Sequence, residues 1–95
     1  MGAEKTLQTN IIKYLKSKKC FVMKLTVVPG VPTGTSDVFF CLEGFYGFIE
    51  VKASKTAPFR PLQPEFISKM NEWSWAKAVY PENWSRIKDE LDTIL

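Results

Sequence analysis

Residues 37–52 read DVFFCLEGFYGFIEVK and give the clearest structural signal in the sequence. Two runs rich in β-branched and aromatic residues flank Glu43-Gly44, where the glycine can adopt the positive φ that a tight hairpin turn needs. We therefore predict two antiparallel strands, over residues 37–42 and 45–52.

This hairpin brings charged side chains together. Pairing around the turn places Asp37 opposite roughly residue 50, because the numbers of paired residues in a hairpin sum to a constant. Successive side chains of a strand alternate between faces, so Glu50 and Lys52 point one way while Ile49 and Val51 point the other. Two carboxylates and one ammonium group are thus predicted to meet at one end of the sheet.

The segments before the hairpin predict a helix, a strand and a loop. Residues 3–18 carry apolar side chains at helical spacing opposite a lysine-rich side, which is typical of an amphipathic helix. Residues 20–28 are dense in β-branched and aromatic residues and stop at Pro29, as a strand should. A loop rich in glycine and proline then leads to Asp37.

The segments after the hairpin predict a loop, a helix, a short strand and a last helix. Residues 53–62 hold two prolines and basic side chains, and the helix that starts near Pro64 continues to about Trp75. Residues 76–80 are short and apolar, and Pro81 opens the last helix. The order αβββαβα predicts a single α/β domain over residues 1–95, with a mixed central sheet flanked by helices.

The aromatic residues raise a question of burial. Trp73 and Trp84 lie on the apolar faces of their predicted helices, so we expect both in the core. Other aromatic side chains are numerous enough that some remain exposed on a monomer and bury at an interface, or else all belong to the core: Phe45, Tyr46, Phe48 and Trp75.

Composition excludes several kinds of chemistry. The chain has no histidine, which removes imidazole bases, histidine-ligated zinc and serine–histidine or cysteine–histidine pairs. Cys20 and Cys41 lie in apolar runs, where a reduced thiol serves as a small buried hydrophobe. No apolar run is long enough to span a bilayer, so we expect a soluble, intracellular protein with no membrane partner.

The charge is unevenly distributed along the chain. The net charge is +3, but the first 36 residues carry six lysines against Glu4 alone. A basic N-terminal third attracts a polyanion, although a well-solvated helix face explains the same pattern.

Oxygen ligands at the predicted strand ends indicate a hard metal. Two carboxylates with a backbone carbonyl and water form the environment that Mg²⁺ or Mn²⁺ prefers. For the Glu-x-Lys tripeptide alone, a solvated sheet face with a weak surface ion pair is the ordinary explanation. The preceding aspartate, thirteen positions earlier, strengthens the metal-site interpretation without settling it.

Four separated matches make the chain similar to a known family. They are Glu4, Gly34-Thr35-Ser36-Asp37, Glu50-Val51-Lys52 and Gln63, in that order. Over nearly its whole length the chain resembles a stand-alone VRR-NUC domain, a virus-type replication-repair nuclease of the PD-(D/E)xK superfamily. That family commonly has proline before the aspartate, where this chain has Ser36.

The resemblance implies a restriction-endonuclease-like fold and a Mg²⁺- or Mn²⁺-dependent endonuclease acting on branched DNA, such as Holliday junctions or flaps. It implies that Asp37, Glu50 and the Val51 carbonyl hold the metal, and that Lys52 assists catalysis. Glu4 and Gln63 would complete the site, although each also suits the start of an ordinary helix. Resolvase-like relatives act as homodimers, and symmetric cutting of a junction takes two active sites.

Several basic side chains are candidates for contacts with DNA phosphates. A soluble protein of a bacterial cytoplasm or nucleoid is expected, with phage origin as an alternative. Three other functions remain open: a nicking or non-specific nuclease of the same fold, a non-catalytic nucleic-acid-binding module, and a protein-interaction domain. The candidate DNA contacts are Lys13, Lys16, Lys18, Lys19, Lys24, Lys55 and Arg60.

Overall fold

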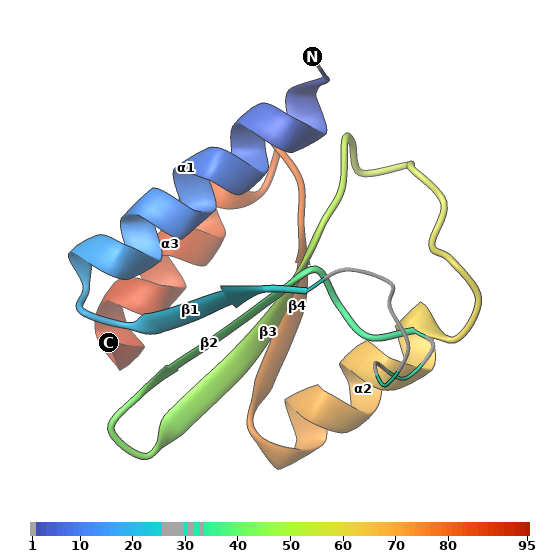
Figure 1. Ribbon diagram of the computed structural model, residues 1–95. Coiled ribbons are helices and arrows are strands. Elements are labelled where there is room, and N and C mark those ends of the chain that lie inside the picture. The colour runs from blue at the N-terminus through green and yellow to red at the C-terminus, as the bar shows by residue number, and fades with distance from the viewer. Residues whose placement is uncertain (1, 26–29, 31, 33) are drawn as a thin grey trace.

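The computed structural model describes residues 2–25, 30, 32 and 34–95. Within them the chain forms an α/β fold, a mixed four-stranded sheet with three helices in the predicted order αβββαβα (Figure 1). The elements are α1 (Ala3–Ser17), β1 (Phe21–Lys24), β2 (Val38–Leu42), β3 (Phe45–Val51), α2 (Gln63–Trp73), β4 (Trp75–Val79) and α3 (Trp84–Ile94).

The strands lie in the order β1-β2-β3-β4. The first three are antiparallel to their neighbours, whereas β4 runs parallel to β3 after the crossover through α2. The hairpin register is the predicted one, from Val38 opposite Ile49 to Leu42 opposite Phe45. Glu43 and Gly44 both have positive φ, as a two-residue hairpin turn requires.

The two faces of the sheet are covered differently. Helices α1 and α3 lie side by side over one face, and α2 lies over β3 and β4 on the other (Figure 1). The apolar core fills the α1–α3 side, where alternate strand residues such as Phe40 and Ile49 are fully buried. None of the described helices is long and apolar enough to cross a membrane.

Several element boundaries differ from the prediction. Helix α2 ends at Trp73 rather than at about Trp75, so β4 begins at Trp75 instead of residue 76. Strand β1 ends at Lys24, and residues 26–28, the rest of the predicted strand, lie outside the described residues. Helix α3 begins at Trp84, three residues after Pro81, because Asn83 organises a turn first. The Asn83 side chain accepts a hydrogen bond from the Tyr80 amide at 2.9 Å and donates one to a carbonyl of β4.

The tryptophans correct one burial prediction. Trp84 is half-buried and packs against the core, but Trp73 is 61% exposed, so its predicted core position is wrong. The chain reverses at Ser74, between α2 and β4, so Trp73 and Trp75 point to different sides. Trp75 takes the core position and donates its indole N–H to Glu90 at 2.7 Å.

Candidate active site

Asp37 is fixed where three strands meet, one residue before β2 begins. Its main-chain carbonyl accepts a hydrogen bond from the Leu25 amide at 2.6 Å. Its carboxylate Oδ2 accepts another from the Val51 amide at 3.0 Å. Continuing the hairpin register by one step beyond the last paired residues of β2 and β3 puts Asp37 opposite Glu50. The two predicted carboxylates therefore lie together at the end of β3.

Glu50 is a buried carboxyl group, with its side chain only 5% exposed. Burial and the neighbouring negative charge of Asp37 raise the pKa of Glu50 to about 7. Within the described part of the chain, its Oε1 atom has no hydrogen-bond partner. A buried carboxylate oxygen without a donor is costly unless a cation or a proton satisfies it.

Lys52 is also buried, and a loop holds its ammonium group. Its Nζ donates to the Pro58 carbonyl at 2.6 Å and lies 4.1 Å from the centroid of the Phe59 ring. The residue is 6% exposed, and no ion pair joins it to Glu50 among the residues that the structure describes. This burial contradicts the alternative that Glu50 and Lys52 form a solvated surface pair.

Gln63 is the first residue of α2. It is polar but buried, at 1% exposure. Its Oε1 accepts a hydrogen bond from the Arg60 amide at 2.8 Å, which ties the basic loop to the start of the helix. Its Nε2 is buried and, among described atoms, unpartnered. The Arg60 guanidinium lies 3.9 Å from Asp37 Oδ1, so the same loop also reaches the acidic pair.

Glu50, Lys52, Arg60 and Gln63 line one cleft of about 300 Å³. Glu4, in the first turn of α1, also lines it, so residues from three of the four sequence matches meet there, and Asp37 lies next to it through its hydrogen bond with Val51. The residues lining the cleft are Glu4, Glu50, Val51, Lys52, Ala57, Pro58, Arg60 and Gln63.

A close backbone contact positions the loop before Asp37. Gly34 has a φ of +91°, and a Cβ atom there would lie 2.7 Å from the carbonyl oxygen of Leu62. Both features require glycine at this position. The contact sets the Asp37 loop against the residue that precedes Gln63, which couples the two sides of the cleft.

The cleft residues fit a hard divalent cation. Asp37 and Glu50 supply carboxylate oxygens, one of them lacking a donor. The N–H and C=O of one strand residue point to the same neighbour, so the Val51 carbonyl faces the Asp37 side, where its amide is bonded. No group of three Asp, Glu, Cys or His side chains suited to a metal occurs in residues 2–25, 30, 32 and 34–95. Two carboxylates, a carbonyl and water match what Mg²⁺ uses in proteins.

The predicted DNA-binding side chains are scattered. Lys24 ends β1 beside the Asp37 region, and Lys55 and Arg60 belong to the loop over the cleft. Lysines 16, 18 and 19 lie at the other end of α1, about 20 Å from Glu4 by the rise of the helix, with Lys13 between. The candidate DNA contacts thus lie towards the C-terminal end of α1, at the end of β1 and on the loop over the cleft, and their contact with DNA stays a prediction.

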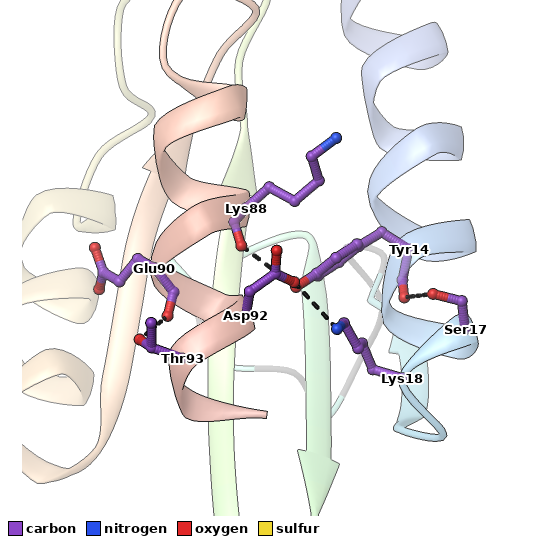
Figure 2. A network of polar contacts seen from close by, with 7 residues as sticks. All are labelled: Tyr14, Ser17, Lys18, Lys88, Glu90, Asp92 and Thr93. Atoms are coloured by element: carbon purple, nitrogen blue, oxygen red, sulfur yellow. Dashed lines mark hydrogen bonds and ion pairs between the residues drawn. The ribbon is translucent and has the colours of Figure 1, made fainter.

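Lys18 takes part in a network that joins α1 to α3 (Figure 2). Its Nζ lies 3.1 Å from Asp92 Oδ1, and the Tyr14 hydroxyl donates to the same oxygen. Burial and the Asp92 carboxylate raise the pKa of Tyr14, and its hydrogen bond lowers the pKa of Asp92. This contact serves helix packing, far from the cleft.

Sequence reasoning missed the residues that hold Lys52. Pro58 and Phe59 lie in a loop without periodicity, so no pattern indicated that a carbonyl and a ring would cover an ammonium group. The one available signal was Pro58 itself, because proline restricts the loop that carries it. Comparison with protein-family models, curated proteins and solved structures finds no match to this chain.

Proposed function

We propose that the chain is a metal-dependent nuclease of the PD-(D/E)xK superfamily, which hydrolyses phosphodiester bonds in branched DNA. The observation that carries the proposal is the burial of Glu50 and Lys52 in one cleft, with a Glu50 oxygen left without a donor and the half-buried Asp37 beside it. Structural ion pairs satisfy their own oxygens, whereas here a buried Glu50 oxygen has no donor among the described residues and is open to a proton or a cation.

Asp37, Glu50 and the Val51 carbonyl would hold Mg²⁺ or Mn²⁺. Such an ion, when bound, lowers the pKa of a water molecule and neutralises charge on the phosphate. The chain itself contributes orientation: the Val51 amide fixes the Asp37 carboxylate, and burial keeps the Glu50 carboxyl in a defined position.

Lys52 would stabilise negative charge on the phosphate that is cut. Its ammonium group already lies in the cleft, directed by the Pro58 carbonyl and the Phe59 ring rather than by a carboxylate. Gln63 would steady the basic loop through the Arg60 amide, and Glu4 would face the metal from α1. Ser36, in place of the family's proline, is buried and supplies no metal ligand in this proposal.

Branched DNA and a homodimer belong to the same proposal. One chain supplies one cleft, and cutting a four-way junction symmetrically takes two. Exposed Phe21 and Met23 on the edge strand β1 offer apolar surface that a second copy can bury. Sedimentation of the chain and of the Phe21→Ser variant tests this part, because a monomer in both cases contradicts it.

The direct test is cleavage of labelled four-way junction, flap and linear duplex DNA with Mg²⁺, Mn²⁺ or chelator. Metal-dependent cutting should fall at least about a hundredfold in Lys52→Ala and in Asp37→Asn. Lys69→Ala is the matched control, because Lys69 is an exposed lysine of α2 that does not line the cleft. It should cut within a few-fold of the unchanged protein.

Cutting of each DNA substrate with each metal distinguishes the alternative functions. Equal nicking of all three substrates by a monomer favours the non-specific nuclease. Binding without cutting under every metal, in a folded protein, overturns the nuclease and leaves a nucleic-acid-binding module.

A further inference from the structure

A second hollow adjoins the cleft at the N-terminal end of α1. Its volume is about 510 Å³, and it is lined by Gly2, Glu4, Lys5, Gln8 and Lys24. Glu4 lines both hollows, so the groove continues from the wall of the cleft towards the end of β1. We call these five residues the α1–β1 groove.

Two elements bring cationic side chains to this groove. Lys5 and Gln8 project from α1, one helical turn apart, and Lys24 closes the end of β1. Lys5 and Lys24 are exposed, and within the described chain neither forms an ion pair. Two ammonium groups outnumber the single carboxylate of Glu4, so the groove has a net positive charge.

We infer that the α1–β1 groove binds a backbone phosphate of the nucleic acid adjacent to the one that is cut. The inference rests on the proposed nuclease function. A phosphate offers several acceptor oxygens, which match the ammonium groups of Lys5 and Lys24 and the amide of Gln8. The carboxylate of Glu4, between the two hollows, separates this phosphate from the one beside Lys52.

The groove divides the basic residues of α1 into two groups with different roles. Lys5 belongs to the phosphate track that leads out of the cleft. Lys16 lies about 17 Å further along α1 by helical rise, and Lys19 follows two residues after the helix ends, so neither belongs to this track. These two lysines provide a control with the same change of charge.

The experiment measures binding of fluorescein-labelled junction, duplex and single-stranded DNA by anisotropy, in chelator, between about 50 and 200 mM KCl. The double variant Lys5→Gln, Lys24→Gln is compared with Lys16→Gln, Lys19→Gln. The first should bind about tenfold more weakly and lower the slope of log K against log salt by about one to two. The second should change the slope by less than half as much.

Cleavage kinetics add a separate readout. The groove variant should raise KM and retain kcat, because its lysines contact a phosphate that does not react. Equal effects of the two double variants, or no effect of either, overturn the groove while leaving a protein that binds and cuts DNA. If the unchanged protein neither binds nor cuts any of the three DNAs, the proposed function fails, and the groove fails with it.

Discussion

The two faces of β3 bury side chains of opposite character. Towards α1 and α3, the side chains of Ile49 and Val51 are at most 1% exposed and belong to the apolar core. Towards α2, Glu50 and Lys52 are almost as buried, at 5% and 6%. One strand, by simple alternation, thus contributes to a core on one side and to a charged cleft on the other.

The chain gives up stability on the charged side of β3. Three buried side-chain atoms lack hydrogen-bond partners among the described residues, on Ser36, Glu50 and Gln63. All three residues belong to the cleft or to the segment leading to Asp37. Each such atom costs roughly 1–3 kcal/mol of free energy of unfolding, so the cleft is built at the expense of the fold.

The largest effect should come from the apolar face. Phe40 is fully buried and its ring packs against Phe45 and Trp75. Phe40→Ala should lower the free energy of unfolding by about 4 kcal/mol, measured by urea denaturation in chelator. Phe39→Ala, on the other face and half-buried, is the control and should cost less than half as much. Equal losses would contradict the division between the faces.

The charged face should respond in the opposite direction. The pKa of Glu50 is raised to about 7 in the folded protein, above its ordinary value of 4.5, so its ionisation opposes folding as the pH rises through this window. Glu50→Gln should therefore stabilise the metal-free protein by about 2 kcal/mol at pH 8 and have no effect near pH 4. The same variant should lose metal-dependent cleavage.

Urea denaturation in chelator at both pH values measures the effect of Glu50→Gln. Glu72→Gln, an exposed residue of α2, is the control and should change stability by less than 0.5 kcal/mol at either pH. A Glu50 variant that is less stable at pH 8 than the unchanged protein would show that the carboxylate is satisfied by the fold itself.

The contact between the two walls of the cleft should have an intermediate effect. Gly34→Ala forces a Cβ atom against the Leu62 backbone at a φ of +91°. It should cost about 1.5 kcal/mol in thermal or urea unfolding and weaken cleavage, because the Asp37 loop must move. Gly44→Ala shares the positive φ but has nothing within 4 Å, so the difference between the variants reports the contact. If Gly34→Ala and Gly44→Ala lost the same amount of stability, the contact between Gly34 and Leu62 would have no role.

The smallest effect should come from Trp73. The residue is 61% exposed, and the Lys69 Nζ atom lies 5.5 Å from the centroid of its ring. Trp73→Ala should change the free energy of unfolding by less than about 0.5 kcal/mol, whereas Trp75→Ala should cost several times more. A large loss at Trp73 would mean that α2 is buried more deeply than its exposure indicates.

The hairpin and the acidic pair could be predicted from sequence because both depend on local rules. A two-residue turn with glycine fixes the register, and the register places Asp37 opposite Glu50 without knowledge of any other element. The element order follows equally from periodicity and from proline and glycine positions.

What could not be predicted depends on which elements meet in space. The capture of Lys52 by the Pro58 carbonyl follows from the path of an irregular loop, and the exposure of Trp73 from how far α2 covers the sheet. The lysines of α1 were correctly placed on a helix, but only packing decides which end of that helix adjoins the cleft. Metal binding, DNA cleavage and dimer formation stay predictions.

The parallel pairing of β4 with β3 has a consequence for the order in which the chain folds. The Lys52 amide donates to the Val79 carbonyl at 2.8 Å, across a crossover that includes the whole of α2. The β2–β3 hairpin needs only local contacts, so we expect it to form early, before β4 docks. Glu50 and Lys52 are then still hydrated, and the desolvation of the cleft takes place late. Folding intermediates should accordingly retain ordinary carboxyl ionisation, and the acid strength of Glu50 should change only in the final step.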